Sequence, residues 1–111
     1  MGIELELHAE RPALDWDRSR ATLIRGSYDH GDALAETLLN TTEAEHGSLA
    51  RVDAYGDTLF DGQQAEAALL RAPALSRNHP SEPRTAAVRD LMEMLQACSR
   101  TPGSYLWFVG D

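Results

Sequence analysis

Apolar and polar residues alternate near the start of the sequence, in the order Ile3, Glu4, Leu5, Glu6, Leu7, His8. A period of two predicts a β-strand over residues 3–8, with the aliphatic face buried and the other face in water. Glutamates on the wet face protect a sheet from pairing with another chain, so we expect this strand at an edge. Pro12 ends it.

A pattern with helical spacing occupies residues 83–99. Apolar residues recur every three or four positions, at Val88, Leu91, Met92, Leu95 and Cys98. This spacing predicts the best-defined helix of the chain, with one face packed on a sheet. Ser81 or Glu82 would cap its start, and Pro83 suits the first turn because no hydrogen bond is lost there.

The segment after this helix is apolar on both faces. Pro102 and Gly103 end the helix, and residues 104–109 then form a short aromatic run. A strand without a polar face predicts a central position in the sheet, covered on both sides. Trp107 should therefore bury a large area.

Residues 13–27 fit two structures. Asp15 could cap a short helix, or residues 21–25 could form a short strand; the composition favours the helix, and the strand remains the alternative. A cluster of turn-forming residues follows. Asp32 would then cap a helix over residues 33–45.

The middle of the chain predicts one more strand and one more helix. Residues 49–55 read as a strand that Gly56 breaks. Asp61 and Gln64 have the spacing of a capping box, which opens a helix over residues 62–72. With 111 residues in all, the sequence predicts a single α+β domain whose sheet has three, or possibly four, strands with about three helices packed on it.

The charge of the chain limits its partners. The formal net charge is −8, and all ten basic residues are arginines. Phosphate binding needs clustered basic residues, so the charge argues against a nucleic-acid surface and would suit a basic protein partner. The absence of lysine from the sequence excludes Schiff-base chemistry and the lysine of a phosphate-binding loop.

Cys98 is the only cysteine, which excludes an internal disulfide and a cysteine-rich zinc site. Its place on the apolar face of the last helix predicts a buried, inert thiol. The first ten residues lack the pattern of a secretory signal, and no apolar run reaches the ~18 residues of a membrane-spanning helix. We therefore expect a cytoplasmic protein with no membrane partner.

Polar groups gather where a strand is predicted to lead into a helix, at Asp53, Tyr55, Gly56, Asp57 and Thr58. Small folds often place ligand- or partner-binding groups at such a junction. Asp53 and Asp57 could instead bond to nearby backbone, and Tyr55 could support the core or face a partner. A weaker group of metal-ligand residue types matches no strong pattern: Asp29, His30, Asp32, Glu36 and His46. No catalytic motif, metal or cofactor is predicted.

Two blocks of sequence resemble a family of small uncharacterised bacterial proteins. The blocks are residues 55–64, with Tyr-Gly-Asp-Thr, Phe60 and Gln64, and residues 105–111, Tyr-Leu-Trp-Phe-Val-Gly-Asp. The family pattern has Pro where this chain has Ala54, and Asn where it has Asp61. The resemblance implies no activity. It implies a shared fold in which the two blocks meet, so that one polar cluster at the sheet edge would contain Asp53, Tyr55, Asp57, Gly110 and Asp111.

Two functions remain after these exclusions. The sequence favours a non-enzymatic protein-binding module, of the inhibitor or immunity type, because the chain is small and acidic and lacks a catalytic set. The alternative is a small enzyme or metal-binding domain that uses the carboxylates of Asp53 and Asp57 with one histidine.

Overall fold

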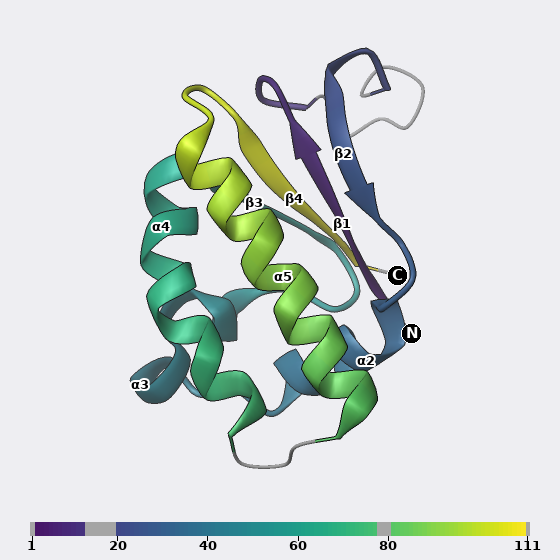
Figure 1. Cartoon of the computed structure of the whole chain (residues 1–111), viewed down its shortest axis with the longest axis vertical. Helices are drawn as coiled ribbons and strands as arrows, with labels where there is room; N and C mark the ends of the chain where they lie inside the picture. The colour runs from purple at the N-terminus through teal and green to yellow at the C-terminus, as the bar shows by residue number, and fades with distance from the viewer. Residues whose placement is uncertain (1, 13–19, 78–80, 111) are drawn as a thin grey trace.

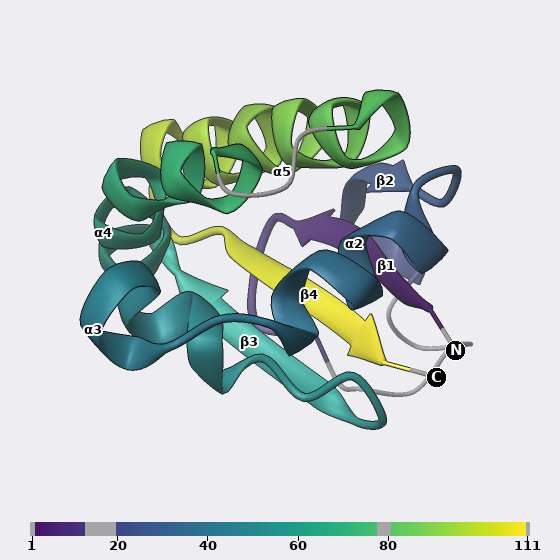
Figure 2. The ribbon, with the colours of Figure 1, turned by 90° about the horizontal axis from the view of Figure 1, so that it is seen from below.

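The computed structural model describes residues 2–12, 20–77 and 81–110. They form an α+β domain in which four antiparallel strands make one sheet, in the order β2-β1-β4-β3, and four α-helices gather on one side of it (Figures 1 and 2). The elements are β1 (Ile3–His8), β2 (Leu23–Ser27), α2 (Gly31–Leu39), α3 (Glu43–His46), β3 (Asp57–Asp61), α4 (Gly62–Arg71), α5 (Glu82–Arg100) and β4 (Tyr105–Gly110). Short 3-10 turns occupy Arg20–Thr22, Gly47–Arg51 and Ala72–Ser76.

The core lies between the sheet and the helices. The aliphatic face of β1 and the inner residues of β3 and β4 pack against α5, as the helical spacing predicted. Figure 1 shows α5 in front of the sheet, running roughly along the direction of β4. The fully buried side chains at this interface include Leu5, Leu91, Leu95, Cys98, Leu106 and Phe108.

Strand β4 occupies the centre of the sheet, which confirms the prediction from its two apolar faces. It pairs with β1 on one side, where Leu5 faces Phe108, and with β3 on the other, where Phe60 faces Leu106. Trp107 is buried on the face away from the helices, and its indole N–H donates to Asp57 Oδ1 at 2.9 Å. Both faces of β4 are therefore covered.

The predicted strand at residues 49–55 is wrong. Residues 47–51 form a 3-10 turn that buries Leu49, and the strand comes after Gly56, as β3. The sequence of β3, Asp-Thr-Leu-Phe-Asp, has an aspartate at each end. Aspartate is uncommon in strands and frequent in turns, so this segment resembles a loop. An edge strand tolerates those charges because they lie on its open face, while Phe60 alone anchors the strand in the core.

Strand β1 was predicted at an edge with one face in water; the edge position is wrong, and the wet face is confirmed only at Glu4. The strand lies between β2 and β4, and its second face is buried at Glu6, which is 5% exposed, and at His8, which is 0% exposed. Burial of these groups is tolerated because they satisfy each other, with His8 Nε2 3.0 Å from Glu6 Oε1. The hydroxyl of Tyr28 donates to Glu6 Oε2 at 2.8 Å.

The helix favoured within residues 13–27 is also wrong where the structure describes that segment. Residues 20–22 form a 3-10 turn and residues 23–27 form β2, which is the alternative and supplies the fourth strand. Pairing with β1 decides this outcome, because the register from Leu5 with Ser27 to His8 with Leu23 completes hydrogen bonds that a short helix would leave unused. The proposed cap Asp15 lies outside the described residues.

Helix α2 begins earlier and ends earlier than predicted. His30, not Asp32, is at the N-cap position, and Asp32 lies in the first turn, where its carboxylate interacts favourably with the helix dipole. The helix stops at Leu39 because Asn40 and the threonines after it leave helical geometry, and α3 follows as a fourth, four-residue helix.

The local signals for α4 and α5 are confirmed. Asp61 accepts a hydrogen bond from Gln64 N–H while the Gln64 side chain accepts from Asp61 N–H, which is a complete capping box. Ser81 caps α5, and Pro83 lies in its first turn. No described helix is both long enough and apolar enough to cross a membrane.

Candidate functional site

The side chains predicted as a site at residues 53–58 mostly build the turn itself. Asp53 Oδ1 accepts the backbone N–H of Tyr55 at 2.9 Å, and Thr58 Oγ1 accepts the backbone N–H of Asp53 at 3.1 Å. Asp57 receives the indole N–H of Trp107, as described above. The two carboxylates offered for catalysis or metal binding therefore have structural partners.

Tyr55 differs from its neighbours in this turn. Its side chain is 71% exposed, and its phenol makes no hydrogen bond to any described residue. Of the two roles open to it from sequence, the structure excludes support of the core. An exposed aromatic with a free hydroxyl is suited to contact a partner.

The two blocks that carry the family resemblance meet in space. The N–H of Gly110, at the end of β4, donates to Gly56 O in the turn at 2.7 Å. A polar cluster therefore lies at the beginning of the edge strand β3, with Asp53, Tyr55 and Asp57 beside Gly110. Asp111, the remaining predicted member, lies outside the described residues.

Gly110 has no room for a side chain, which gives a test of this contact. A Cβ at Gly110 would lie 2.5 Å from Asp53 O and 2.6 Å from Gly56 N, and backbone atoms cannot move aside cheaply. Gly110→Ala should lower the free energy of unfolding by about 1–3 kcal/mol in chemical denaturation, the usual range for overpacking.

Gly62→Ala is the control for that measurement. A Cβ at Gly62, in the first turn of α4, would meet Cys98 O at an ordinary 3.5 Å. This variant should be neutral or slightly more stable, because alanine is the better helix former. Equal stability of Gly110→Ala and Gly62→Ala would contradict the close approach of the two blocks.

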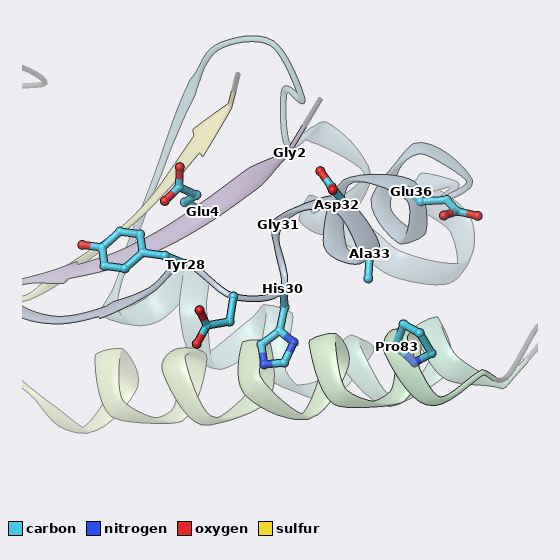
Figure 3. Close-up of a pocket in the computed structure, with 10 residues that line it drawn as sticks. Gly2, Glu4, Tyr28, His30, Gly31, Asp32, Ala33, Glu36 and Pro83 are labelled. Atoms are coloured by element: carbon cyan, nitrogen blue, oxygen red, sulfur yellow. The ribbon is translucent and has the colours of Figure 1, made fainter.

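A cavity of about 540 Å³ lies at the same end of the sheet, between the end of β2, the start of α2 and the start of β1. The carboxylates in its lining are Glu4, Asp29, Asp32 and Glu36. Figure 3 shows Glu4 on β1, Tyr28 on the segment that follows β2, Asp32 and Glu36 on α2, and Pro83 at the start of α5. Ile3 pairs with Gly110, so the cavity and the turn flank the same end of the sheet.

The acidic cavity lacks compensating cations. Within the part of the chain that the structure describes, none of its four carboxylates forms an ion pair. The pKa of Tyr28, in the lining, is raised to about 12 by burial, by its hydrogen bond to Glu6 and by the charges of Glu6 and Glu4, and the charge of Arg20 opposes this shift. The four carboxylates therefore give the cavity an excess of negative charge.

The sequence offered three of these four residues, Asp29, Asp32 and Glu36, as weak metal-ligand candidates, with turn formation and helix capping as the explanation of the two aspartates. Glu4 was missed because it lies in a separate segment of the sequence, on β1. In the described residues no group of three or more His, Cys, Asp or Glu side chains has the geometry to hold a metal ion. Among the described residues, the acidic lining therefore has no metal-ligand geometry.

A second polar constellation lies behind β1. His8 Nδ1 is 2.9 Å from Thr22 Oγ1 and its Nε2 is 3.0 Å from Glu6, which is the order of hydroxyl, imidazole and carboxylate found in hydrolases. A catalytic histidine must reach its substrate, however, and His8 is 0% exposed. Hydrogen bonding within the fold accounts for these residues.

Cys98 is fully buried, as predicted, and burial raises the pKa of its thiol, partly offset by a hydrogen bond from Ser104. A thiol of this kind stays protonated and is a poor nucleophile.

Comparisons with protein-family models, with curated proteins and with solved structures gave no match for this chain. The resemblance to a bacterial family therefore stays a prediction.

Proposed function

We propose that the chain is a non-enzymatic protein-binding module, of the inhibitor or immunity type, that takes a basic segment of a partner protein into the acidic cavity. The observation that supports this proposal most is the set of four carboxylates around one cavity, none of which forms an ion pair within residues 2–12, 20–77 and 81–110. Such a site is complete only when a ligand supplies the positive charge.

The surroundings of the cavity support a protein partner over a small cation. The exposed ring of Tyr55 lies in the turn that flanks the same end of the sheet, and aromatic side chains of this kind are frequent binding anchors. The net charge of −8 would also speed the encounter with a basic protein. An arginine or lysine side chain in the cavity and a contact with Tyr55 would together define the interface.

The test is capture of a partner by the immobilised protein from the lysate of its source organism, at about 0.01 M and 0.15 M salt. Electrostatic screening lengths at these concentrations are about 30 Å and 8 Å, so a charge-driven complex should be captured more strongly at the lower one. We expect a basic protein to be retained by the wild type and lost by the triple variant Glu4→Gln, Asp29→Asn, Glu36→Gln.

The matched control is Glu10→Gln, Glu45→Gln, Glu66→Gln. These glutamates are exposed and lie away from the cavity lining, and their substitution changes the net charge by the same three units. Asp32 is left in place in both variants because it supports the first turn of α2. Capture of no protein at either salt concentration, or equal loss in both variants, would rule the proposal out.

A further inference from the structure

The two outer strands of the sheet differ in how well their open edges are protected. Strands β2 and β3 are the outer members of the order β2-β1-β4-β3. Strand β3 begins and ends with an aspartate, and the side chain of Gln64 already accepts the backbone N–H of Asp61 at its end. Strand β2, with the sequence Leu-Ile-Arg-Gly-Ser, has no aspartate, glutamate, lysine or proline, the residues that usually protect an edge. Of the strands that the structure describes, β2 therefore has the less protected edge.

The backbone of Gly26 faces this open edge. In an antiparallel ladder the backbone groups of successive residues point to alternate sides of the strand. Ala9 N–H donates to Thr22 O at 2.8 Å, so the backbone of Ala9 faces β2. Leu5 lies four positions earlier and faces β2 as well, so its partner Ser27 faces β1. Gly26, next to Ser27, consequently directs its N–H and C=O away from β1.

The open edge is regular in the half of β2 that leads toward the acidic cavity. The register shift between β1 and β2 lies at Leu7 and His8, near the start of β2. Past the end of β2, the backbone of Tyr28 forms no hydrogen bond to a described residue. Its ring folds back over Gly26, where a Cβ would lie 2.5 Å from two of the ring carbons. This half of the edge thus offers free backbone groups and an aromatic surface to an added strand.

Strand β2 leads directly into the acidic cavity. Tyr28 and Asp29 follow the strand, and both belong to the cavity lining. A strand rises about 3.3 Å per residue, so a segment paired with Gly26 would reach Asp29 about 10 Å further along. The four carboxylates of the cavity, which form no ion pair within the described ranges, favour a basic residue at that place.

We propose that the basic segment of the partner binds as an extended strand, added antiparallel to β2 at its open edge. An arginine or lysine three positions before the residue that pairs with Gly26 would then enter the acidic cavity. The antiparallel direction continues the sheet, whose three strand pairs are all antiparallel. Backbone hydrogen bonds supply affinity in this mode of recognition, and the cavity selects the basic side chain. The inference rests on the proposed function, which supplies the basic segment.

The test is an NMR titration of the isotopically labelled full chain with two capped peptides. The first is a hexapeptide of alternating arginine and valine, and the second has the same sequence with every backbone nitrogen methylated. Methylation keeps the charge and removes the backbone donors. We expect saturable binding of the first peptide, with nuclear Overhauser contacts to Gly26 Hα. Its affinity should exceed that of the methylated peptide at least about tenfold, because two or more backbone hydrogen bonds are lost.

A pair of variants locates the peptide on β2. Ile24→Lys adds a positive charge to β2 at a side chain that is 51% exposed, and Leu70→Lys adds the same charge on α4 at one that is 81% exposed. The first should weaken binding of the unmodified peptide by up to about fivefold, the cost of like charges on neighbouring strands, and the second should bind as the wild type does. Equal binding by the two variants would place the peptide away from β2.

The outcomes separate the added strand from the proposed function. Equal affinity of the two peptides, or contacts to Leu59 on the edge of β3 in place of Gly26, would overturn the added strand and leave the acidic cavity as a site for a basic segment. The absence of saturable shifts with the unmodified peptide would also overturn it. The triple variant Glu4→Gln, Asp29→Asn, Glu36→Gln should bind the unmodified peptide more weakly than the wild type. Undiminished binding by that variant, with the Gly26 contacts retained, would instead contradict the role of the cavity and with it the proposed function.

Discussion

Removal of residues 105–111 is expected to unfold the domain. Strand β4 pairs with β1 and with β3, so its loss leaves the inner edges of both strands without partners. It also removes Leu106, Trp107 and Phe108 from the interior. At roughly 1.5–3 kcal/mol for each large apolar side chain, the three contribute about 5–9 kcal/mol, which is comparable with the whole stability of a small domain.

Circular dichroism during heating and the dispersion of amide NMR signals would measure this loss. Deletion of Asp111 alone is the control, because it leaves every residue of β4 in place. That shorter protein should melt cooperatively, near the temperature of the full chain. A cooperative transition in the longer deletion would show that β4 is peripheral, and it would contradict the strand order β2-β1-β4-β3.

The second large effect is expected from Leu91→Ala. Leu91 is 0% exposed, and it lies on the face of α5 that packs against the sheet. Truncation leaves a cavity that the surrounding strands can only partly fill, because they are held in register by β4. The free energy of unfolding should fall by about 2–5 kcal/mol in urea or guanidinium denaturation.

Leu70→Ala provides the matched control for this measurement. Leu70 is also a helical leucine, but it is 81% exposed on α4. Its truncation removes the same atoms without a cavity and should change stability by no more than about 0.5 kcal/mol. Similar losses in the two variants would mean that Leu91 does not face the sheet.

The helices could be read from the sequence because their signals are local. The capping box of Asp61 and Gln64 and the cap at Ser81 depend only on residues three positions apart, and the buried face of α5 repeats with the period of the helix. The central place of β4 was also predictable, because a strand with two apolar faces must be covered on both.

The identity of the third strand could not be read in this way. Residues 49–55 contain more of the pattern expected for a strand than residues 57–61, yet the chain pairs the latter with β4. The position of Phe60 opposite Leu106 determines which segment pairs with β4, and this contact joins segments that are far apart in the sequence. Likewise, Glu6 and His8 are buried because Tyr28 and Thr22 approach them, which no alternation within β1 could indicate.

The candidate sites likewise differ in whether local sequence or tertiary contacts define them. The sequence by itself located the turn around Tyr55 and indicated, through the net charge, that a partner should be basic. Only the tertiary structure brought Glu4 to α2 to form the acidic cavity. The physical reason is that turns and caps are satisfied within a few residues, whereas a cavity is enclosed by segments that meet only after the core has packed.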